Sequence, residues 1–227
     1  MAERKKPKRA GGEKTMTLKK VQSCVELTQD SKRRLDLSFK AVAVVPKVVR
    51  ALSDVDELDL SRNLIRALPD FIRSFVRIRL LDLHSNYLEQ LPVAIGRLRN
   101  LLVLNLCNNR LTSLPDELGL LTELHTLHLC INRLEALPAS VGALKELRRL
   151  GLADNRFGRV PGCLSRLAKL QSVNLKGNPL FAPREAGPAG PGPPAVMEGL
   201  YLATDSVLCE GCRSTCRTER KALKEGA

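Results

Sequence analysis

A repeat period of 23 residues constrains this 227-residue chain more than any other feature of its sequence. An aliphatic residue recurs at that interval at Leu35, Leu58, Leu81, Leu104, Leu127, Leu150 and Val173. Asparagines keep the same register at Asn63, Asn86, Asn109, Asn132, Asn155 and Asn178, and prolines at Pro46, Pro69, Pro92, Pro115, Pro138 and Pro161. Seven units in one register predict a stack of like structural units.

The consensus of one unit, LxxLxLxxNxLxxLPxxIxxLxx, contains two kinds of local structure. The alternation in LxL predicts a short strand whose leucines share one face. The proline, followed three residues later by an aliphatic residue, predicts a short α or 3₁₀ segment. One unit cannot bury its own leucines, so neighbouring units must stack. The sequence therefore predicts an α/β fold: a curved, horseshoe-like solenoid with seven parallel strands on the concave side and short helical segments on the convex side.

The recurring asparagine has a physical role in such a stack. Its side-chain amide both donates and accepts hydrogen bonds, so it can satisfy backbone groups that water does not reach. The first unit, around RLDLSFKAVAVVP, has Lys40 where the asparagine is expected. We therefore interpret this unit as a terminal cap, in which the lysine extends to solvent. The preceding SCVELT stretch predicts a short strand that covers the open edge of the sheet.

Composition divides the chain into four parts. Residues 1–20 read as a disordered basic arm, and residues 21–181 as the solenoid with its N-terminal cap. Residues 182–199 are rich in Ala, Gly and Pro and are typical of a linker. Residues 200–227 form a charged, cysteine-containing tail.

These motifs carry a family resemblance. The 23-residue LPxxI unit is that of leucine-rich repeats, and DELDLSRNLIR, LDLHSNYLEQLP, ALKEL and the C-x2-C-x3-C tail resemble intracellular leucine-rich repeat proteins of Ras-suppressor type. The resemblance covers roughly residues 15–220. It implies a cytoplasmic, non-enzymatic protein associated with male germ cells.

Charge and cysteine usage suggest the compartment. The chain has 37 Lys+Arg against 24 Asp+Glu, a formal net charge of +13. It has no long apolar run and no apolar N-terminal stretch, so we expect neither membrane insertion nor a secretory signal. Its seven scattered cysteines do not form a secreted disulfide pattern. The expected location is the cytoplasm, with nuclear entry through the basic KKPKR run as an alternative.

The expected binding surface lies on the concave sheet and its edge. One column of strand residues reads Asp36, Asp59, Asp82, Asn105, His128 and Gly151. A second column, the rim, is defined as the residues that follow each asparagine: Leu64, Tyr87, Arg110, Arg133 and Arg156. Recurring like charges repel, which folding does not require. Because Tyr and Arg dominate interface energetics, we predict that the partner contacts are Asp59, Asp82, Tyr87, Arg110, Arg133 and Arg156.

Other activities find less support in the sequence. No glycine-rich phosphate loop, nucleophile elbow or paired acid and base is present, so we predict no enzymatic activity, cofactor or small-molecule substrate. His84, Cys107, Cys130 and His128 could in principle bind zinc, but side chains on a sheet run parallel rather than converging. Cys209, Cys212 and Cys216 leave three alternatives open: metal, redox chemistry or ordinary thiols. A nucleic-acid-associated role for the basic arm is the rival hypothesis to a protein partner, although aromatic residues are scarce.

Overall fold

The computed structural model describes residues 16–180. Three regions predicted from composition lie outside the described residues: most of the basic arm with its KKPKR run, the linker at 182–199 and the tail at 200–227. Cys209, Cys212 and Cys216 lie outside them as well.

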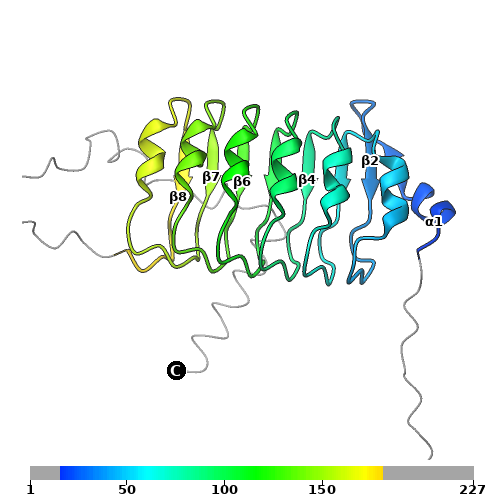
Figure 1. Cartoon of the computed structure of the whole chain (residues 1–227), viewed down its shortest axis with the longest axis horizontal. Helices are drawn as coiled ribbons and strands as arrows, with labels where there is room; N and C mark the ends of the chain where they lie inside the picture. Colours follow the sequence, from blue (N-terminus) through cyan, green and yellow to red (C-terminus); the bar gives the residue numbers. More distant parts are fainter. Residues whose placement is uncertain (1–15, 181–227) are drawn as a thin grey trace, which may run out of the picture.

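An eight-stranded sheet runs the length of the described chain, in the order β1 to β8 (Figure 1). Seven strands are parallel, as predicted, and β1 pairs antiparallel with β2. The strands are β1 (Val25–Leu27), β2 (Arg33–Asp36), β3 (Glu57–Asp59), β4 (Leu80–Asp82), β5 (Val103–Asn105), β6 (Thr126–His128), β7 (Arg149–Gly151) and β8 (Ser172–Asn174). The pairing register advances by 23 residues per strand, so Leu58 lies between Leu35 and Leu81. The predicted register is therefore confirmed.

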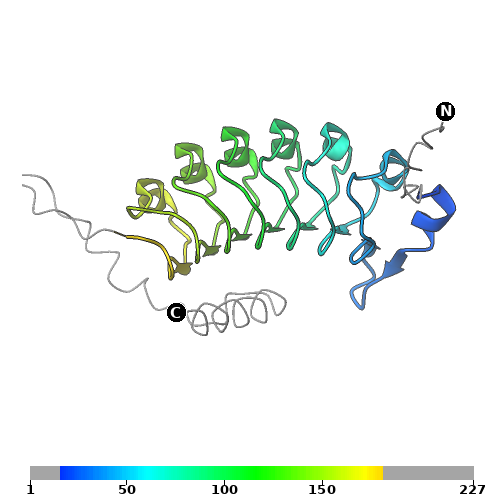
Figure 2. The same ribbon diagram turned by 90° about the horizontal axis from the view of Figure 1, so that it is seen from below.

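Short 3₁₀ helices cover the convex side (Figure 2). They are η1 (Lys47–Leu52), η2 (Asp70–Ser74), η3 (Val93–Arg97), η4 (Asp116–Leu120), η5 (Ala139–Ala143) and η6 (Gly162–Arg166). The repeat proline precedes each helix by one residue, in an extended conformation, rather than occupying the first helical position. Its carbonyl accepts the first helical hydrogen bond, as from Val49 N to Pro46 O at 3.0 Å. The convex 3₁₀ geometry is one of the two forms that the sequence predicts.

The hydrophobic core is a column of aliphatic side chains between the sheet and the 3₁₀ helices. In the units of β2 to β7, both inward leucines, such as Leu58 and Leu60, are fully buried. In the last unit, Val173 and Leu175 take these positions and are 4% and 6% exposed. Phe75 and Phe157 are the largest buried side chains. Each fully buried leucine contributes roughly 1.5–3 kcal/mol relative to an exposed one. Because every unit packs only on its neighbours, this stabilisation accumulates along the stack.

The asparagine ladder takes the role predicted from its chemistry. The Asn63 Nδ2 donates to Leu37 O, Leu60 O and Ser61 O at 2.8–3.0 Å, while its Oδ1 accepts from Val42 N at 3.0 Å. The same pattern recurs at Asn86, Asn109, Asn132 and Asn155. Each amide therefore ties its own unit to the preceding one through buried backbone groups.

The chain turns away from each strand through the left-handed backbone region. The residue before each ladder position has φ between 53° and 76°: Phe39, Arg62, Ser85, Asn108, Ile131, Asp154 and Gly177. This shared conformation places the side chains of one position next to each other along the edge of the sheet.

Close packing on the convex side depends on glycine. A Cβ on Gly119 would lie 2.4 Å from Ser140 O, and one on Gly96 would lie 2.6 Å from Glu117 O. Such approaches are far inside van der Waals contact, so any larger residue would push neighbouring 3₁₀ helices apart.

The N-terminal cap matches the prediction in one respect and differs in another. Strand β1 covers the open edge of the sheet, as SCVELT predicts, and Lys40 is exposed. However, residues 18–20, assigned to the disordered arm, belong to helix α1 (Leu18–Gln22). Val21 of α1 is fully buried, so the helix is held by packing at the end of the core rather than by helix propensity.

Candidate binding surface

The sheet register brings the predicted concave column together. Asp36 pairs with Asp59, Asp59 with Asp82, and Asp82 with Asn105 on adjacent strands. Adjacent strands lie about 4.8 Å apart, so these side chains form one continuous row across the concave face.

The structure gives the recurring acid of this row a local role. Asp36, Asp59 and Asp82 each accept, through Oδ1, the backbone N–H two residues later, at 2.8–2.9 Å. Asn105 does the same for Cys107 N at 3.2 Å. Each side chain therefore closes the turn that ends its strand, which explains why an acid or amide recurs there despite like-charge repulsion.

The pKa of Asp36 lies below its usual value. Burial would raise it, but the hydrogen bonds from Ser38 lower it, and Arg34 and Lys40 add attraction. The folded protein therefore favours the ionised carboxylate at this position.

Asp59 is held by a second interaction. Its Oδ2 lies 2.6 Å from Arg34 Nη2 on the neighbouring strand, and the residue is 8% exposed. Both carboxylate oxygens are engaged within the protein. Asp59 therefore contributes to a binding surface through its shape and its negative electrostatic potential rather than through a new ion pair.

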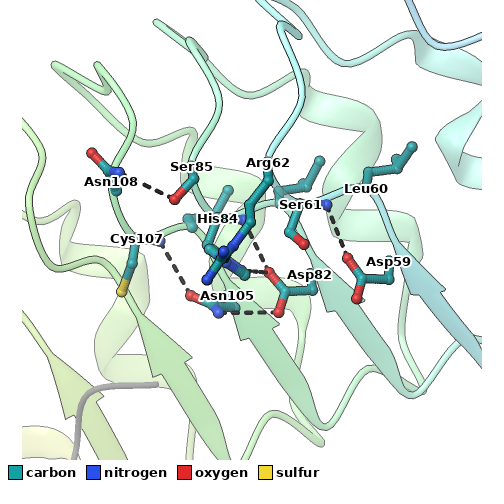
Figure 3. Close-up of polar contacts among 12 residues, drawn as sticks. Asp59, Leu60, Ser61, Arg62, Asp82, His84, Ser85, Asn105, Cys107 and Asn108 are labelled. Carbon is teal, nitrogen blue, oxygen red and sulfur yellow. Dashed lines mark hydrogen bonds and ion pairs between the residues drawn. The ribbon is translucent and has the colours of Figure 1, made fainter. Parts of the chain in front are cut away.

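Asp82 lies at the centre of a four-residue polar network (Figure 3). Its Oδ1 lies 2.7 Å from His84 Nδ1, and its Oδ2 accepts from Asn105 Nδ2 at 3.2 Å. The Arg62 Nε–H donates to His84 Nε2 at 3.3 Å. Because His84 Nε2 accepts from Arg62, the ring proton is on Nδ1, which donates it to Asp82. The network as a whole connects side chains from three units. The sequence signal for this network is weak, because Arg62 lies in a turn and only the folded stack places it over His84.

Two arginines stack on aromatic rings along the edge of the sheet. The guanidinium carbon of Arg110 lies 4.7 Å from the ring centroid of Tyr87, and that of Arg62 lies 4.7 Å from the ring centroid of Phe39. Tyr87 and Arg110 were both predicted as contact residues, and the structure shows that they act as a pair. Phe39 and Arg62 were not predicted, since Phe39 belongs to the irregular first unit.

The sulfur-containing side chains of the concave face are packed rather than exposed. Cys107 and Cys130 are fully buried and cluster with Ala153. Gly151 leaves space for Cys130, because a Cβ on Gly151 would lie 2.8 Å from Cys130 Sγ. Within residues 16–180, no three His, Cys, Asp or Glu side chains are grouped so that they could hold a metal ion. The same described residues contain no helix long and apolar enough to cross a membrane.

Comparison with known proteins places the repeat in a recognised class. Residues 70–181 match the model for a leucine-rich repeat region. A leucine-rich repeat protein of Leptospira interrogans is similar in structure, with a TM-score of 0.58 and 33% identity, over 70% of this chain and 45% of that one. An internalin from Listeria monocytogenes has a TM-score of 0.54 and 21% identity, over 60% of this chain and 38% of that one, and shows the shared fold alone.

The present chain thus aligns with less than half of the length of either structure. The repeat match, the register of the sheet and the asparagine ladder agree with one another. Together they show that residues 70–181 form a leucine-rich repeat region and that the described chain has the leucine-rich repeat solenoid fold.

Proposed function

We propose that this protein is a non-catalytic, intracellular scaffold that binds a protein partner on the concave face of its solenoid. The observation that carries the proposal is the network of hydrogen bonds that orders that face. Sheet hydrogen bonds, the asparagine ladder and the turn-closing acids hold successive side chains in fixed columns. A preordered surface loses little conformational entropy when a partner binds.

The residues predicted as contacts divide into two groups. Tyr87, Arg133 and Arg156 are exposed and Arg110 is half-buried, so all four are accessible to a partner. Asp59 and Asp82 contribute chiefly through the negative potential of the N-terminal strands, because their oxygens are already hydrogen-bonded. Acidic strands at one end and arginines toward the other suit a partner with the complementary charge order.

The cellular setting is part of the proposal. The DELDLSRNLIR, LDLHSNYLEQLP and C-x2-C-x3-C segments are similar to those of leucine-rich repeat-containing protein 18. On that resemblance we place the protein in the cytoplasm of male germ cells, where it would act in their development. The odd number and scattered positions of the seven cysteines agree with a reducing compartment.

Proximity labelling in the native cell tests the scaffold proposal. Leu80 and Val103 are half-buried neighbours on the concave face, and Leu80→Glu with Val103→Glu adds two charges there. Val93→Glu with Leu120→Glu makes the same chemical change on the convex side, where both residues are exposed.

We expect the concave variant to lose the labelled partners and the convex variant to retain them. Both should fold, which circular dichroism checks. A labelling profile unchanged in the folded concave variant would refute binding on this face. Binding that depends steeply on salt and is lost with residues 1–20 would instead support the nucleic-acid alternative.

A further inference from the structure

We propose that the rim binds an extended, carboxylate-rich segment of the partner protein, with a bulky apolar side chain of that segment seated on Leu64 and Tyr87. This inference rests on the proposed function, because it names the chemistry of the partner. It adds a site at the edge of the concave face, where the strands turn toward the convex side.

A backbone ladder separate from the sheet fixes the rim. Each rim residue donates its N–H to a carbonyl of the preceding unit at 2.8–2.9 Å: Leu64 to Val42, Tyr87 to Ile65, Arg110 to Leu88, Arg133 to Leu111 and Arg156 to Leu134. The five side chains therefore start from evenly spaced backbone positions. A ligand that crosses the units meets them in a fixed order.

One end of the rim is apolar and accessible. Leu64 is 46% exposed and Tyr87 is 37% exposed. The core does not require an apolar residue at either of these positions. Nearby in the preceding unit, Phe39 is 67% exposed beneath Arg62. Adjacent exposed apolar side chains on an ordered surface are typical of a contact site.

The other end of the rim is cationic. Within residues 16–180, no carboxylate lies within 4.0 Å of the guanidinium groups of Arg110, Arg133 or Arg156. Stacking on Tyr87 covers one face of the Arg110 guanidinium but leaves its N–H edge available. That edge can bind a carboxylate with two parallel hydrogen bonds.

Repeat spacing sets the form of the ligand. Units about 4.8 Å apart place Leu64 roughly 10 Å from Arg110 and roughly 19 Å from Arg156 along the rim. An extended peptide advances about 3.3 Å per residue. The matching segment is therefore about six residues long, with its apolar residue about three residues from the first carboxylate.

A peptide fits this surface better than a single-stranded nucleic acid. Sequence-independent binding of single strands uses open aromatic faces on which bases stack. Here Arg110 covers one face of Tyr87, and Arg62 covers one face of Phe39. The N–H edge of Arg110 pairs with carboxylates and with phosphates alike, so it is the partial covering of the aromatic faces that favours a peptide.

Fluorescence anisotropy with synthetic probes tests this inference on the full chain. The main probe is a labelled peptide with a leucine, a short Gly-Ser spacer and a run of glutamates. One comparison peptide has serine in place of leucine, and another has glutamine in place of glutamate. Labelled oligothymidylate and oligouridylate serve as nucleic-acid probes. We expect the main peptide to bind at least about tenfold more tightly than either comparison peptide.

Matched variants locate the site. Arg133→Glu with Arg156→Glu should weaken binding of the main peptide by at least about tenfold. Arg73→Glu with Arg97→Glu makes the same charge change at exposed convex positions and should leave affinity within about twofold. Tyr87→Ala should weaken binding of the main peptide. Tyr87→Phe should bind it as wild type does, because phenylalanine keeps the ring on which Arg110 stacks. Melting temperatures confirm that each variant is folded.

Three results would overturn the inference: equal losses in the rim and convex variants, equal affinity for the glutamine peptide, or tighter binding of either oligonucleotide. The scaffold proposal fails separately, through an unchanged labelling profile of the Leu80→Glu, Val103→Glu variant. A rim that does not bind the peptide leaves that labelling result unaffected, so the two failures are distinguishable.

Discussion

The side-chain amide of Asn109 donates to the carbonyl oxygen of Leu83, 26 residues earlier in the chain, at 3.0 Å. The same nitrogen reaches Leu106 O at 3.1 Å, and the Asn109 Oδ1 accepts from Leu88 N at 3.0 Å. Leu83 O and Leu106 O also accept from the amides of Asn86 and Asn132, so neighbouring asparagines share these carbonyls. Leu88 N, by contrast, donates to Asn109.

Asn109→Ala should leave the buried Leu88 N–H without its acceptor, and it removes one of the two asparagine donors from each of Leu83 O and Leu106 O. We expect the free energy of unfolding to fall by about 1–3 kcal/mol. Urea denaturation measures it, with Glu135→Ala as the control because Glu135 is exposed. Equal unfolding midpoints for the two variants would contradict the role assigned to the ladder.

Leu106→Ala tests the core. Leu106 is fully buried beside the ladder, and its truncation should leave a cavity. The expected loss is roughly 2–5 kcal/mol of unfolding free energy, measured in the same way. A loss below about 1 kcal/mol would mean that Leu106 does not face the core.

Two convex glycines form a matched pair. Gly119→Ala would bring a Cβ within 2.4 Å of Ser140 O, whereas a Cβ on Gly162 meets nothing within 4 Å. Gly119→Ala should therefore lower the melting temperature. Gly162→Ala should leave it unchanged or raise it slightly, because alanine restricts the unfolded chain. The reverse order would show that the convex helices do not pack this closely.

Asp36 gives a pH dependence whose sign follows from its lowered pKa. Its folded pKa lies below the unfolded value of about 3.9, so its contribution to stability is present above that pH. The contribution is lost as the pH falls through the folded pKa. In urea unfolding, wild type should lose more stability than Asp36→Asn between about pH 5 and about pH 2. Parallel loss in both proteins would remove Asp36 as a contributor.

Residue spacing was sufficient to predict the repeating part of the fold. A fixed period determines which leucines pair across strands, and the chemistry of the amide determines what the asparagines bind. Helix α1 was not predicted, because its five residues have no side-chain cap and continue the basic composition of the N-terminal arm. Its position depends on packing of Val21 at the end of the core, which a local pattern does not contain.

The binding surface was less accessible to sequence reasoning. The D-x-S spacing at Asp36 and Asp59 does signal a closed turn, and it explains the acid column without a ligand. The Arg62–His84 contact and the Arg62–Phe39 stack depend on side-chain conformations across adjacent units. Those conformations emerge only after the units have stacked.

The hydrogen bonds of the ladder also limit how a protein of this kind can change in length. Insertion or loss of a single residue within a unit would shift both the strand pairing and the reach of the next asparagine. Duplication or loss of a whole 23-residue unit would preserve both. Antiparallel β1 closes one end of the sheet, so a whole unit can be added or removed only on the C-terminal side of β2. Genetic change can therefore lengthen or shorten the concave surface in steps of one strand while the remaining columns keep their alignment.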